Sequence, residues 1–294
     1  MLKKEELYIK IKIIIDRVLR YIEKKPNIMH DKQMLEYIKK DRYSLSRFGD
    51  GEFNIIYGNS IGFQDFDTEL ANRLKYILYN ESSKHLTGIP NSFGNLNKFE
   101  DEPKKYWYRY MAFNRKKIIN LLNDNKVYCD SFMTRFYLAY KDKKGCSKYI
   151  KQIKQVWKNR NIVIVEGELS RIGIRNDLFK GAEDIKRILV PSKNAFSVYD
   201  KILSECLKLN KEYLFILSIG PTASILAYDL NKSGYQALDF GHIDLQYEYY
   251  LRSCNKKIKI YGKYNNEVEN GDNVESLEDN EYINQIICNI RIDV

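Results

Sequence analysis

The chain has 294 residues, and its 49 Lys and Arg against 39 Asp and Glu give a formal net charge of +10. A hydrophobic fraction of 44% excludes a disordered chain, and only 15 Gly and 5 Pro exclude collagen-like or linker-like sequence. The length suits one large domain or two small ones. Five dispersed cysteines without a C-x-x-C pair indicate neither a disulfide framework nor a zinc site.

No targeting or membrane-spanning segment is visible. Acidic residues interrupt the N-terminal segment, and no apolar run reaches the roughly 7–15 residues of a secretory signal or the roughly 20 of a membrane span. We therefore expect a cytoplasmic protein, with the inner face of the membrane as a further site. The positive charge is spread among acidic residues, which is typical of a solvated surface. The alternative is attraction to nucleotide-sugars, phospholipid head groups or nucleic acid.

Two helices are expected at the N-terminus. Residues 7–24 carry apolar side chains at helical spacing, which predicts an amphipathic helix that ends at Pro26. A second helix is expected over residues 31–40. The apolar face of the first helix suits packing on the rest of the protein, or contact with a membrane surface. We therefore divide the chain into a helical extension, residues 1–40, and one larger domain, residues 41–294.

The larger domain alternates short apolar strands with helices. Strands are expected over residues 43–48, 85–90, 127–129, 161–165, 188–190, 213–219 and 236–240. Helices are expected over residues 67–80, 104–122, 146–159, 196–208 and 223–231. This alternation predicts an α/β fold with a mostly parallel sheet and helices on both faces. Residues 262–280 are polar and read as a loop or mobile segment, and residues 281–292 as a short final element.

Ligands of an open parallel sheet bind beyond the carboxyl ends of its strands. One such end carries Gly220, Pro221 and Thr222, directly before a predicted helix. Glycine lets the backbone approach a ligand, proline suits a first helical turn, and free N–H groups there favour an anion. The segment is therefore a candidate phosphate site, and a strand–turn–helix without ligand is the alternative.

Two carboxylates follow the first predicted strand, at Asp50 and Glu52. In an extended segment these side chains point the same way, so they can converge on one metal ion or on sugar hydroxyls. Hard ions such as Mg²⁺ and Mn²⁺ take oxygen ligands. Arg47 can orient the two carboxylates or bind phosphate. An ordinary surface turn is the alternative.

Two further clusters lie at predicted strand ends. His242 and Asp244 follow the strand 236–240, with Glu248 one helical turn further on. A histidine at such a point can be a metal ligand, a general base or a donor to phosphate. In the segment 170–177, two arginines stand in a loop that opens a predicted helix. Since a helix N-terminus disfavours cations, these arginines suit recognition of a nucleotide.

Several segments, taken together and in this order, resemble the bacterial GT-D-type glycosyltransferases, a family first described as the domain of unknown function DUF1792. The resemblance covers about residues 40–265. It rests on SLSRFGDGE (44–52), GFQ (62–64), EGELSR (166–171), PSKNAF (191–196), GPTA (220–223), YDL (228–230), DFGHID (239–244) and YE (247–248).

The resemblance implies a Rossmann-like catalytic domain that transfers a hexose, typically glucose from UDP-glucose, to a glycan acceptor on protein or lipid. It implies that Asp50 and Glu52 bind the donor and a metal ion, Mn²⁺ or Mg²⁺. His242, Asp244 and Glu248 would face the reacting sugar. Donor contacts would come from Arg47, Gly49, Gly167, Ser170, Arg171, Asn176, Asn194, Gly220, Pro221 and Thr222.

An acceptor hydroxyl benefits from a carboxylate base in an inverting reaction. We hypothesise that Glu52 or Asp244 is that base. The competing class of function is a non-catalytic nucleotide- or nucleic-acid-binding module with a basic surface. The segment 104–117 (KKYWYRYMAFNRKK) mixes aromatic and basic residues, which fits an acceptor platform or RNA binding. The resemblance favours the transferase, so no nucleic-acid partner is expected.

Overall fold

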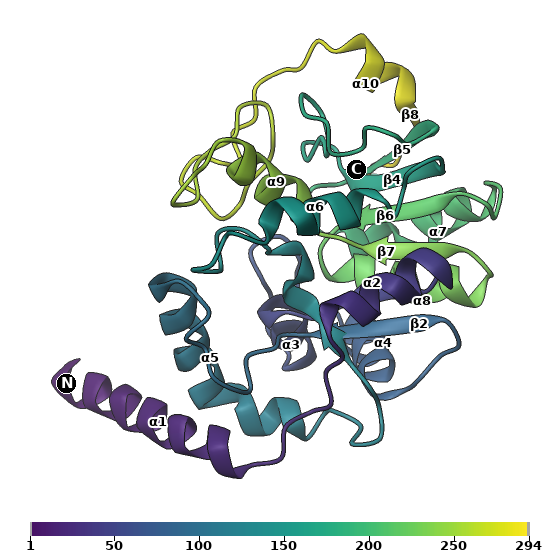
Figure 1. The fold of residues 1–294 in the computed structure, drawn as a ribbon. Coiled ribbons are helices and arrows are strands. Elements are labelled where there is room, and N and C mark those ends of the chain that lie inside the picture. Colours follow the sequence, from purple (N-terminus) through teal and green to yellow (C-terminus); the bar gives the residue numbers. More distant parts are fainter. Residues whose placement is uncertain (1, 293–294) are drawn as a thin grey trace.

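The fold is known from a computed structural model, which describes residues 2–292. Its centre is an eight-stranded sheet in the order β3-β2-β1-β7-β6-β4-β5-β8, and every strand pairing is parallel (Figure 1). The strands are β1 (Ser44–Arg47), β2 (His85–Ile89), β3 (Cys129–Asp130), β4 (Asn161–Gly167), β5 (Asp184–Val190), β6 (Leu214–Ser218), β7 (Gln236–Asp239) and β8 (Ile286–Asn289).

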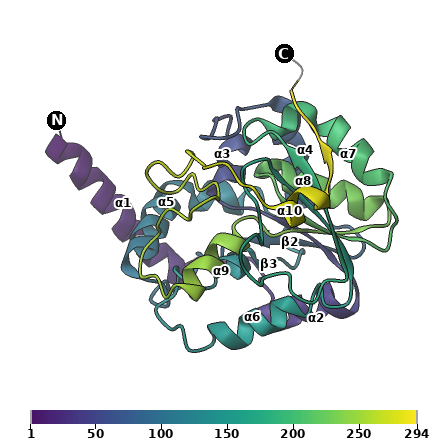
Figure 2. The ribbon, with the colours of Figure 1, turned by 90° about the horizontal axis from the view of Figure 1, so that it is seen from above.

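Helices cover both faces of this sheet (Figure 2). They are α1 (Leu2–Ile22), α2 (Asp31–Lys40), α3 (Asp50–Ile56), α4 (Thr68–Tyr79), α5 (Asp101–Ile119), α6 (Cys146–Lys154), α7 (Tyr199–Leu207), α8 (Pro221–Lys232), α9 (Ile243–Leu251) and α10 (Asn280–Gln285). Short 3₁₀ turns, η1 (Ser131–Thr134) and η2 (Ala195–Val198), complete the elements. Helices α3, α4, α7 and α8 share one hydrophobic cluster, whereas α2, α6 and α9 share a second cluster on the opposite face.

The strands alternate between these two clusters. In β4, Val163 and Val165 belong to the first cluster, and Ile162 and Ile164 to the second. Successive side chains of a strand point to opposite faces, so a strand covered on both sides is apolar throughout. The parallel α/β fold predicted from sequence is confirmed.

The structure corrects several predicted elements. Asp50 begins helix α3, where a turn was expected. No helix follows β4: residues 168–179 form a series of turns. Strand β5 begins at Asp184, four residues before the predicted start. The final element is helix α10 followed by strand β8, which pairs with β5 at the edge of the sheet.

The two N-terminal helices differ in how they pack. Helix α2 buries Met34, Leu35 and Ile38 in the second cluster. Helix α1 lies along α5, and its N-terminal end extends beyond the body of the molecule in both views (Figures 1 and 2). Within residues 2–292, no helix is both long and apolar enough to cross a membrane. The domain boundary at residue 40 stays a prediction.

Candidate active site

A cavity of about 920 Å³ lies at the carboxyl edge of the sheet. Its size is near the upper end of the roughly 300–1,000 Å³ typical of ligand sites. Strand ends contribute Arg47, Ser131, Gly167, Ser218 and Asp239 to its wall. The cavity therefore lies where an open parallel sheet places its ligands.

Most of the predicted site residues meet at this cavity, but some do not. The wall contains Arg47, Gly49, Asp50, Glu52, Gly167, Ser170, Gly220, His242 and Asp244. Six predicted residues do not belong to the wall: Arg171, Asn176, Asn194, Pro221, Thr222 and Glu248. Most of these six hold segments that shape the cavity, as their contacts show.

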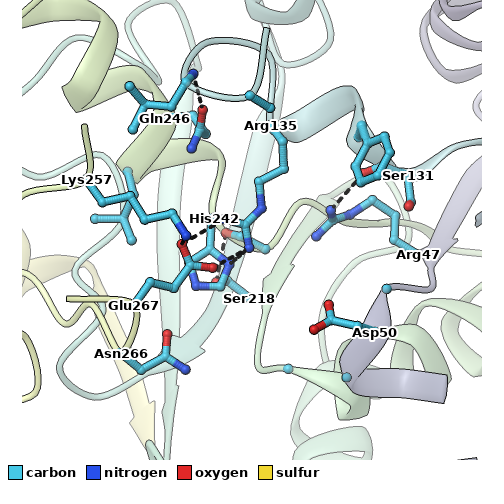
Figure 3. Close-up of a pocket in the computed structure, with 18 of the residues that line it drawn as sticks. Arg47, Asp50, Ser131, Arg135, Ser218, His242, Gln246, Lys257, Asn266 and Glu267 are labelled. Carbon is cyan, nitrogen blue, oxygen red and sulfur yellow. Dashed lines mark hydrogen bonds and ion pairs between the residues drawn. The ribbon is translucent and has the colours of Figure 1, made fainter. Parts of the chain in front are cut away.

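Asp50 and Glu52 occupy the first turn of α3. The expected extended geometry is wrong, because side chains two residues apart on a helix point about 160° apart, toward nearly opposite sides. Glu52 instead caps its own helix: its Oε2 accepts the Gly49 N–H at 2.6 Å. Asp50 points into the cavity (Figure 3), and the Tyr106 hydroxyl donates to its carboxylate.

The surroundings of Glu52 change its acidity. Burial of the carboxylate, reinforced by the negative charge of Asp239, raises the pKa of Glu52 to about 7. An ordinary glutamate is fully ionised at neutral pH, whereas a carboxyl group with a pKa of about 7 is about half protonated there. A carboxyl group on a cavity wall with such a pKa suits general acid–base chemistry.

Arg47 binds the end of β7 and not the Asp50–Glu52 segment. Its Nε donates to the Asp239 carbonyl at 2.6 Å and its Nη2 to Asp239 Oδ1 at 3.0 Å. Its Nη1 donates to Thr134 Oγ1 at 2.7 Å. Arg47 therefore ties β1, β7 and the turn after β3 together. A side chain at Gly241 would place its Cβ only 2.2 Å from Arg47 Nη2, so this corner requires glycine.

The start of α8 is shaped by a loop from the N-terminal half of the chain. Gly220 has φ +58°, and a Cβ there would lie 2.5 Å from the Phe63 ring. Asn194 holds that loop: its N–H donates to the Phe63 carbonyl at 2.9 Å, and its Oδ1 accepts the Asp65 N–H at 2.7 Å. The predicted donor contact Asn194 thus has a positioning role. Pro221 occupies the first turn of α8, as expected.

Small residues form a second tight corner, after β4. A Cβ at Gly167 would lie 3.2 Å from Ser170 Oγ and 3.3 Å from Ser192 Oγ. Among the described residues, the buried hydroxyls of Ser192 and Thr222 have no hydrogen-bond partner. Buried polar groups are usually paired, so the Ser192 hydroxyl, which lies on the cavity wall, is available to a ligand or to water, whereas Thr222 lies behind the wall.

Three charged side chains, Arg135, Lys257 and Glu267, gather on one side of the cavity, opposite Asp50 (Figure 3). Arg135 donates to both oxygens of Glu267, at 2.6 and 2.9 Å, and Lys257 lies 3.2 Å from the same carboxylate. Although burial opposes it, the Arg135 guanidinium holds the pKa of Glu267 well below its usual range.

His242 adjoins this cluster. Arg135 Nη2 lies 3.3 Å from His242 Nδ1, and since arginine only donates, Nδ1 accepts and the ring proton lies on Nε2. Burial, together with the Arg135 charge, lowers the pKa of His242 to about 4. The imidazole is therefore neutral at physiological pH and can donate one hydrogen bond from Nε2.

Asp244 belongs to a buried ion-pair network behind the wall. Lys263 Nζ lies 2.6 Å from Asp244 and 3.2 Å from Glu248. Asn176 donates to the same two carboxylates, at 2.8 and 2.6 Å. Because Asp244 is paired with a lysine, we retain Glu52 of the two hypothesised bases. Glu248 and Asn176 stabilise the wall from behind.

The segment beyond α9 is anchored, although its composition indicated a loop or mobile segment. Arg171 donates to the carbonyls of Gly262 and Glu275, at 3.0 and 2.7 Å. Asn265 is fully buried, and its amide donates to the Tyr249 hydroxyl at 2.7 Å. Arg171, predicted to bind a nucleotide, therefore positions the segment that carries Glu267.

The wall offers limited protein ligands for a metal ion. Within the described part of the chain, no three His, Cys, Asp or Glu side chains are grouped so as to hold one. Glu52 is engaged in its helix cap, so of the two predicted metal ligands Asp50 is the one whose carboxylate points into the cavity. Mg²⁺ is commonly held by one or two carboxylates together with substrate phosphates. The residues present fit a cation that is held jointly by Asp50 and by the phosphate groups of a bound substrate.

Sequence reasoning missed Arg135, Lys257 and Glu267. Arg135 follows β3 and η1 but belongs to none of the quoted motifs. Lys257 and Glu267 lie far from any strand end, and only tertiary contacts bring them to the wall. Tyr106 had a signal, because it lies in the aromatic segment interpreted as an acceptor platform.

Comparison with known proteins agrees with this fold. The family described as "Glycosyltransferase GT-D fold" matches residues 45–268. The chain therefore belongs to the GT-D-fold glycosyltransferases, as the sequence resemblance implied. It is similar to a solved structure described as "The highly conserved domain of unknown function 1792 has a distinct glycosyltransferase fold", with a TM-score of 0.87 and 34% identity, over 95% of this chain and 99% of that one.

Further relatives come from streptococci. A structure described as "A New Glycosyltransferase (DUF1792) from Streptococcus sanguinis" has a TM-score of 0.86 and 34% identity, over 90% of this chain and 100% of that one. "Probable glycosyl transferase Gly" of Streptococcus gordonii is 34% identical over 91% of this chain, and "Glycosyltransferase GlyD" of Streptococcus pneumoniae is 36% identical over 88%. The chain spans 39% and 32% of the lengths of these last two proteins.

Proposed function

We propose that this chain transfers a hexose, glucose in the first instance, from a UDP-sugar to a hydroxyl of a glycan acceptor. The observation that carries the proposal is the composition of one cavity wall. A glycine-led helix start, the cations Arg135 and Lys257, and the carboxylates of Asp50 and Glu52 all line this one cavity, with the two cations opposite Asp50. Anion-binding groups and a candidate base are the two requirements of sugar transfer from a diphosphate.

The donor diphosphate is placed at the start of α8 and beside Arg135. Breaking the bond between the anomeric carbon and the diphosphate develops negative charge on the leaving group. Backbone N–H groups at a helix start and fixed cations stabilise that charge without reorganising. Gly220 permits close approach because it carries no side chain, and the Ser192 hydroxyl on the cavity wall is buried without a partner in the described structure.

We propose Mn²⁺ or Mg²⁺ as the cofactor, held by Asp50 and by phosphate oxygens of the donor. When bound, such an ion supplies further charge stabilisation of the leaving diphosphate. Tyr106, which donates to Asp50, fixes the orientation of that carboxylate.

Glu52 is proposed as the base that takes the proton of the acceptor hydroxyl. Its pKa near 7 lets it accept a proton at physiological pH and release it again. Neutral His242 donates from Nε2 toward a sugar hydroxyl.

The acceptor enters by the aromatic side of the cavity. Phe99, Tyr106, Trp107 and Phe132 line this part of the wall, and aromatic faces pack well against the apolar faces of sugar rings. We further propose that the acceptor is a glycan on protein or lipid, and that the reaction takes place in the cytoplasm, at the inner face of the membrane when the glycan is lipid-linked.

A binding experiment tests the donor and the cation separately from catalysis. Thermal unfolding is measured with UDP plus Mn²⁺, with UDP plus chelator, and with each alone. A ligand that binds only the native state raises stability by mass action, so we expect the largest rise in Tm with UDP and Mn²⁺ together. No rise with UDP under any condition would contradict the donor assignment.

Transfer is then screened with a panel of nucleotide-sugars, with Mn²⁺ and with Mg²⁺. Asp50→Asn and Glu52→Gln are each expected to lower transfer by at least about 100-fold, the scale of a lost acid–base or charge-stabilising group. Near-normal transfer by both variants would overturn the site assignment.

A further inference from the structure

Helix α1 carries an apolar stripe that the described chain leaves open to solvent. Eight side chains form this stripe, each between 46 and 78% exposed: Leu7, Tyr8, Ile11, Ile14, Ile15, Val18, Tyr21 and Ile22. The opposite side of the helix packs on α5, where Asp16 is buried and pairs with Arg20 at 2.7 Å and Arg115 at 2.5 Å. The helix is thus fixed by one face, and on the other face Tyr8, at the edge of the stripe, makes a ring contact with Phe113 of α5.

The exposed area is unusual for a monomer. At roughly 160–230 Å² per fully exposed side chain, the stripe presents about 900 Å². The largest apolar patch of a typical monomer is about 300–600 Å². A stable protein–protein interface buries about 800 Å² per partner, so the stripe matches what one half of an interface requires.

The stripe is arranged symmetrically along the helix. Residues equidistant from its centre between Ile14 and Ile15 are of similar type: Leu7 corresponds to Ile22, Tyr8 to Tyr21, and Ile11 to Val18. In two helices that run antiparallel about a two-fold axis at that centre, these residues lie at the same height. An isologous interface places one patch against itself, and this arrangement fulfils that condition.

We propose that the stripe is the interface with a second copy of this chain, in which the two α1 helices pack antiparallel around Ile14 and Ile15. Each α1 then lies between its own α5 and the α1 of the partner subunit, and the apolar face is covered. The proposal concerns assembly and stands independently of the transferase reaction.

The edges of the stripe give the assembly a distinct salt response. Lys12 lies on one flank and Arg17 on the other, and the antiparallel arrangement places Lys12 on the same side as Lys12 of the partner subunit and Arg17 on the same side as Arg17 of the partner subunit. Salt screens this repulsion between like charges, so the dimer is expected to tighten as ionic strength rises. Binding of the same helix to an anionic membrane would weaken as salt rises. The two occupants are therefore distinguishable.

Analytical ultracentrifugation of the full chain is the first test. We expect a species of twice the 34.9 kDa chain mass, with a dissociation constant that falls as NaCl is raised from 50 to 500 mM. Ile14→Glu places a charge at the centre of the stripe and is expected to weaken dimerisation at least 100-fold, while leaving donor hydrolysis and circular dichroism unchanged. Lys10→Glu adds the same carboxylate beside the stripe and is the matched control, expected to remain dimeric.

Cysteine cross-linking tests the antiparallel arrangement. Residues 7 and 22 are about 22 Å apart along one helix, at 1.5 Å per residue. Oxidation of Leu7→Cys mixed with Ile22→Cys is expected to give a covalent dimer, whereas neither variant alone nor the unsubstituted chain does so. Cross-linking of each single variant with itself would show parallel helices and overturn the arrangement.

Three outcomes would overturn the proposal itself. One is a monomer at 100 µM chain in 500 mM NaCl. Another is a dimer that Ile14→Glu leaves intact. The third is a monomer that instead sediments with vesicles of phosphatidylserine and phosphatidylcholine and is released by salt, which would assign the stripe to a membrane surface.

Discussion

Arg135 and Glu267 form a two-point ion pair on the cavity wall, with nitrogen–oxygen distances of 2.9 and 2.6 Å. The pair joins the turn after β3 to the segment beyond α9, 132 residues further along the chain. Arginine binds phosphate with the same two-point geometry that it uses for a carboxylate. Glu267 therefore binds Arg135, the cation that we assign to binding of the donor diphosphate.

Substitutions at this pair should change nucleotide affinity in opposite directions. Glu267→Gln removes the competing anion and is expected to tighten UDP binding by about three- to tenfold. Arg135→Gln removes the cation and is expected to weaken it by about 10- to 100-fold, in line with a charge-assisted hydrogen bond of about 1.5–3 kcal/mol. Isothermal titration calorimetry with UDP measures both.

The control for these variants is a distant exposed pair. Glu205→Gln removes the partner of Lys208 on the surface and should leave UDP affinity unchanged. If Arg135→Gln bound UDP as tightly as the parent chain, Arg135 would have no part in the donor site.

The pKa of Glu52 predicts a pH profile for transfer. A base works in its deprotonated form, so kcat/KM is expected to rise with pH up to about 7 and to level off above it. Glu52→Gln should lower kcat and abolish the rise near pH 7. A parent profile flat between pH 5.5 and 8 would contradict the assignment.

The same carboxyl group affects stability with a definite sign. Its pKa is higher in the folded than in the unfolded chain, so the folded state holds a proton that the unfolded state releases above about pH 4.5. The contribution of Glu52 to the free energy of unfolding therefore falls as pH rises from about 4.5 to about 7. Urea unfolding of the parent chain and of Glu52→Gln at several pH values isolates this difference.

Local patterns in the sequence predicted the sheet, because a strand such as β4, covered on both faces, must be apolar throughout. The sequence prediction failed where a local pattern was misinterpreted, and where the structure depends on contacts between distant parts of the chain. The sequence Gly49-Asp50-Gly51-Glu52 has the spacing of a capping box, with a glutamate three residues after the cap, yet its two glycines favoured a turn. For α1, periodicity predicted an apolar face, but no local pattern states what covers such a face.

The segment 262–275 shows the same limit at the site. Its polar composition is that of an ordinary loop, and its order comes from Arg171 and Arg135, which lie about a hundred residues away in sequence. Contacts at that range leave no periodic signal in a single sequence.

Gly220→Ala tests how closely the donor site is packed. A Cβ there meets the Phe63 ring at 2.5 Å, and the backbone has φ +58°. We expect a loss of about 2–5 kcal/mol in the free energy of unfolding, because overpacking costs about 1–3 kcal/mol and the positive φ about 1–2 kcal/mol. UDP affinity should fall as well.

Gly234→Ala is the matched control. Gly234 also has a positive φ, +87°, but a Cβ there meets only the flexible end of Lys211, at 3.6 Å. This variant should lose only the conformational part, about 1–2 kcal/mol, and bind UDP normally. Equal losses in the two variants would show that contact with Phe63 does not matter.

Variants of Lys263 and Asp244 distinguish a structural role of Asp244 from a catalytic one. Its ammonium lies 2.6 Å from Asp244 and 3.2 Å from Glu248, and all three side chains are at most 4% exposed. Lys263→Met leaves the buried carboxylate of Asp244 without its cation, whereas Glu248 keeps Arg252 at 3.0 Å, and breaking a buried pair costs about 3–5 kcal/mol. Asp244→Asn should also destabilise the chain, while the folded fraction keeps transfer within about tenfold of the parent. Urea unfolding gives the free energy of unfolding, and initial rates at 25 °C give the transfer activity.

A stable Asp244→Asn variant whose kcat fell at least 100-fold would instead make Asp244 the base, because loss of a base removes the reaction and leaves the fold intact.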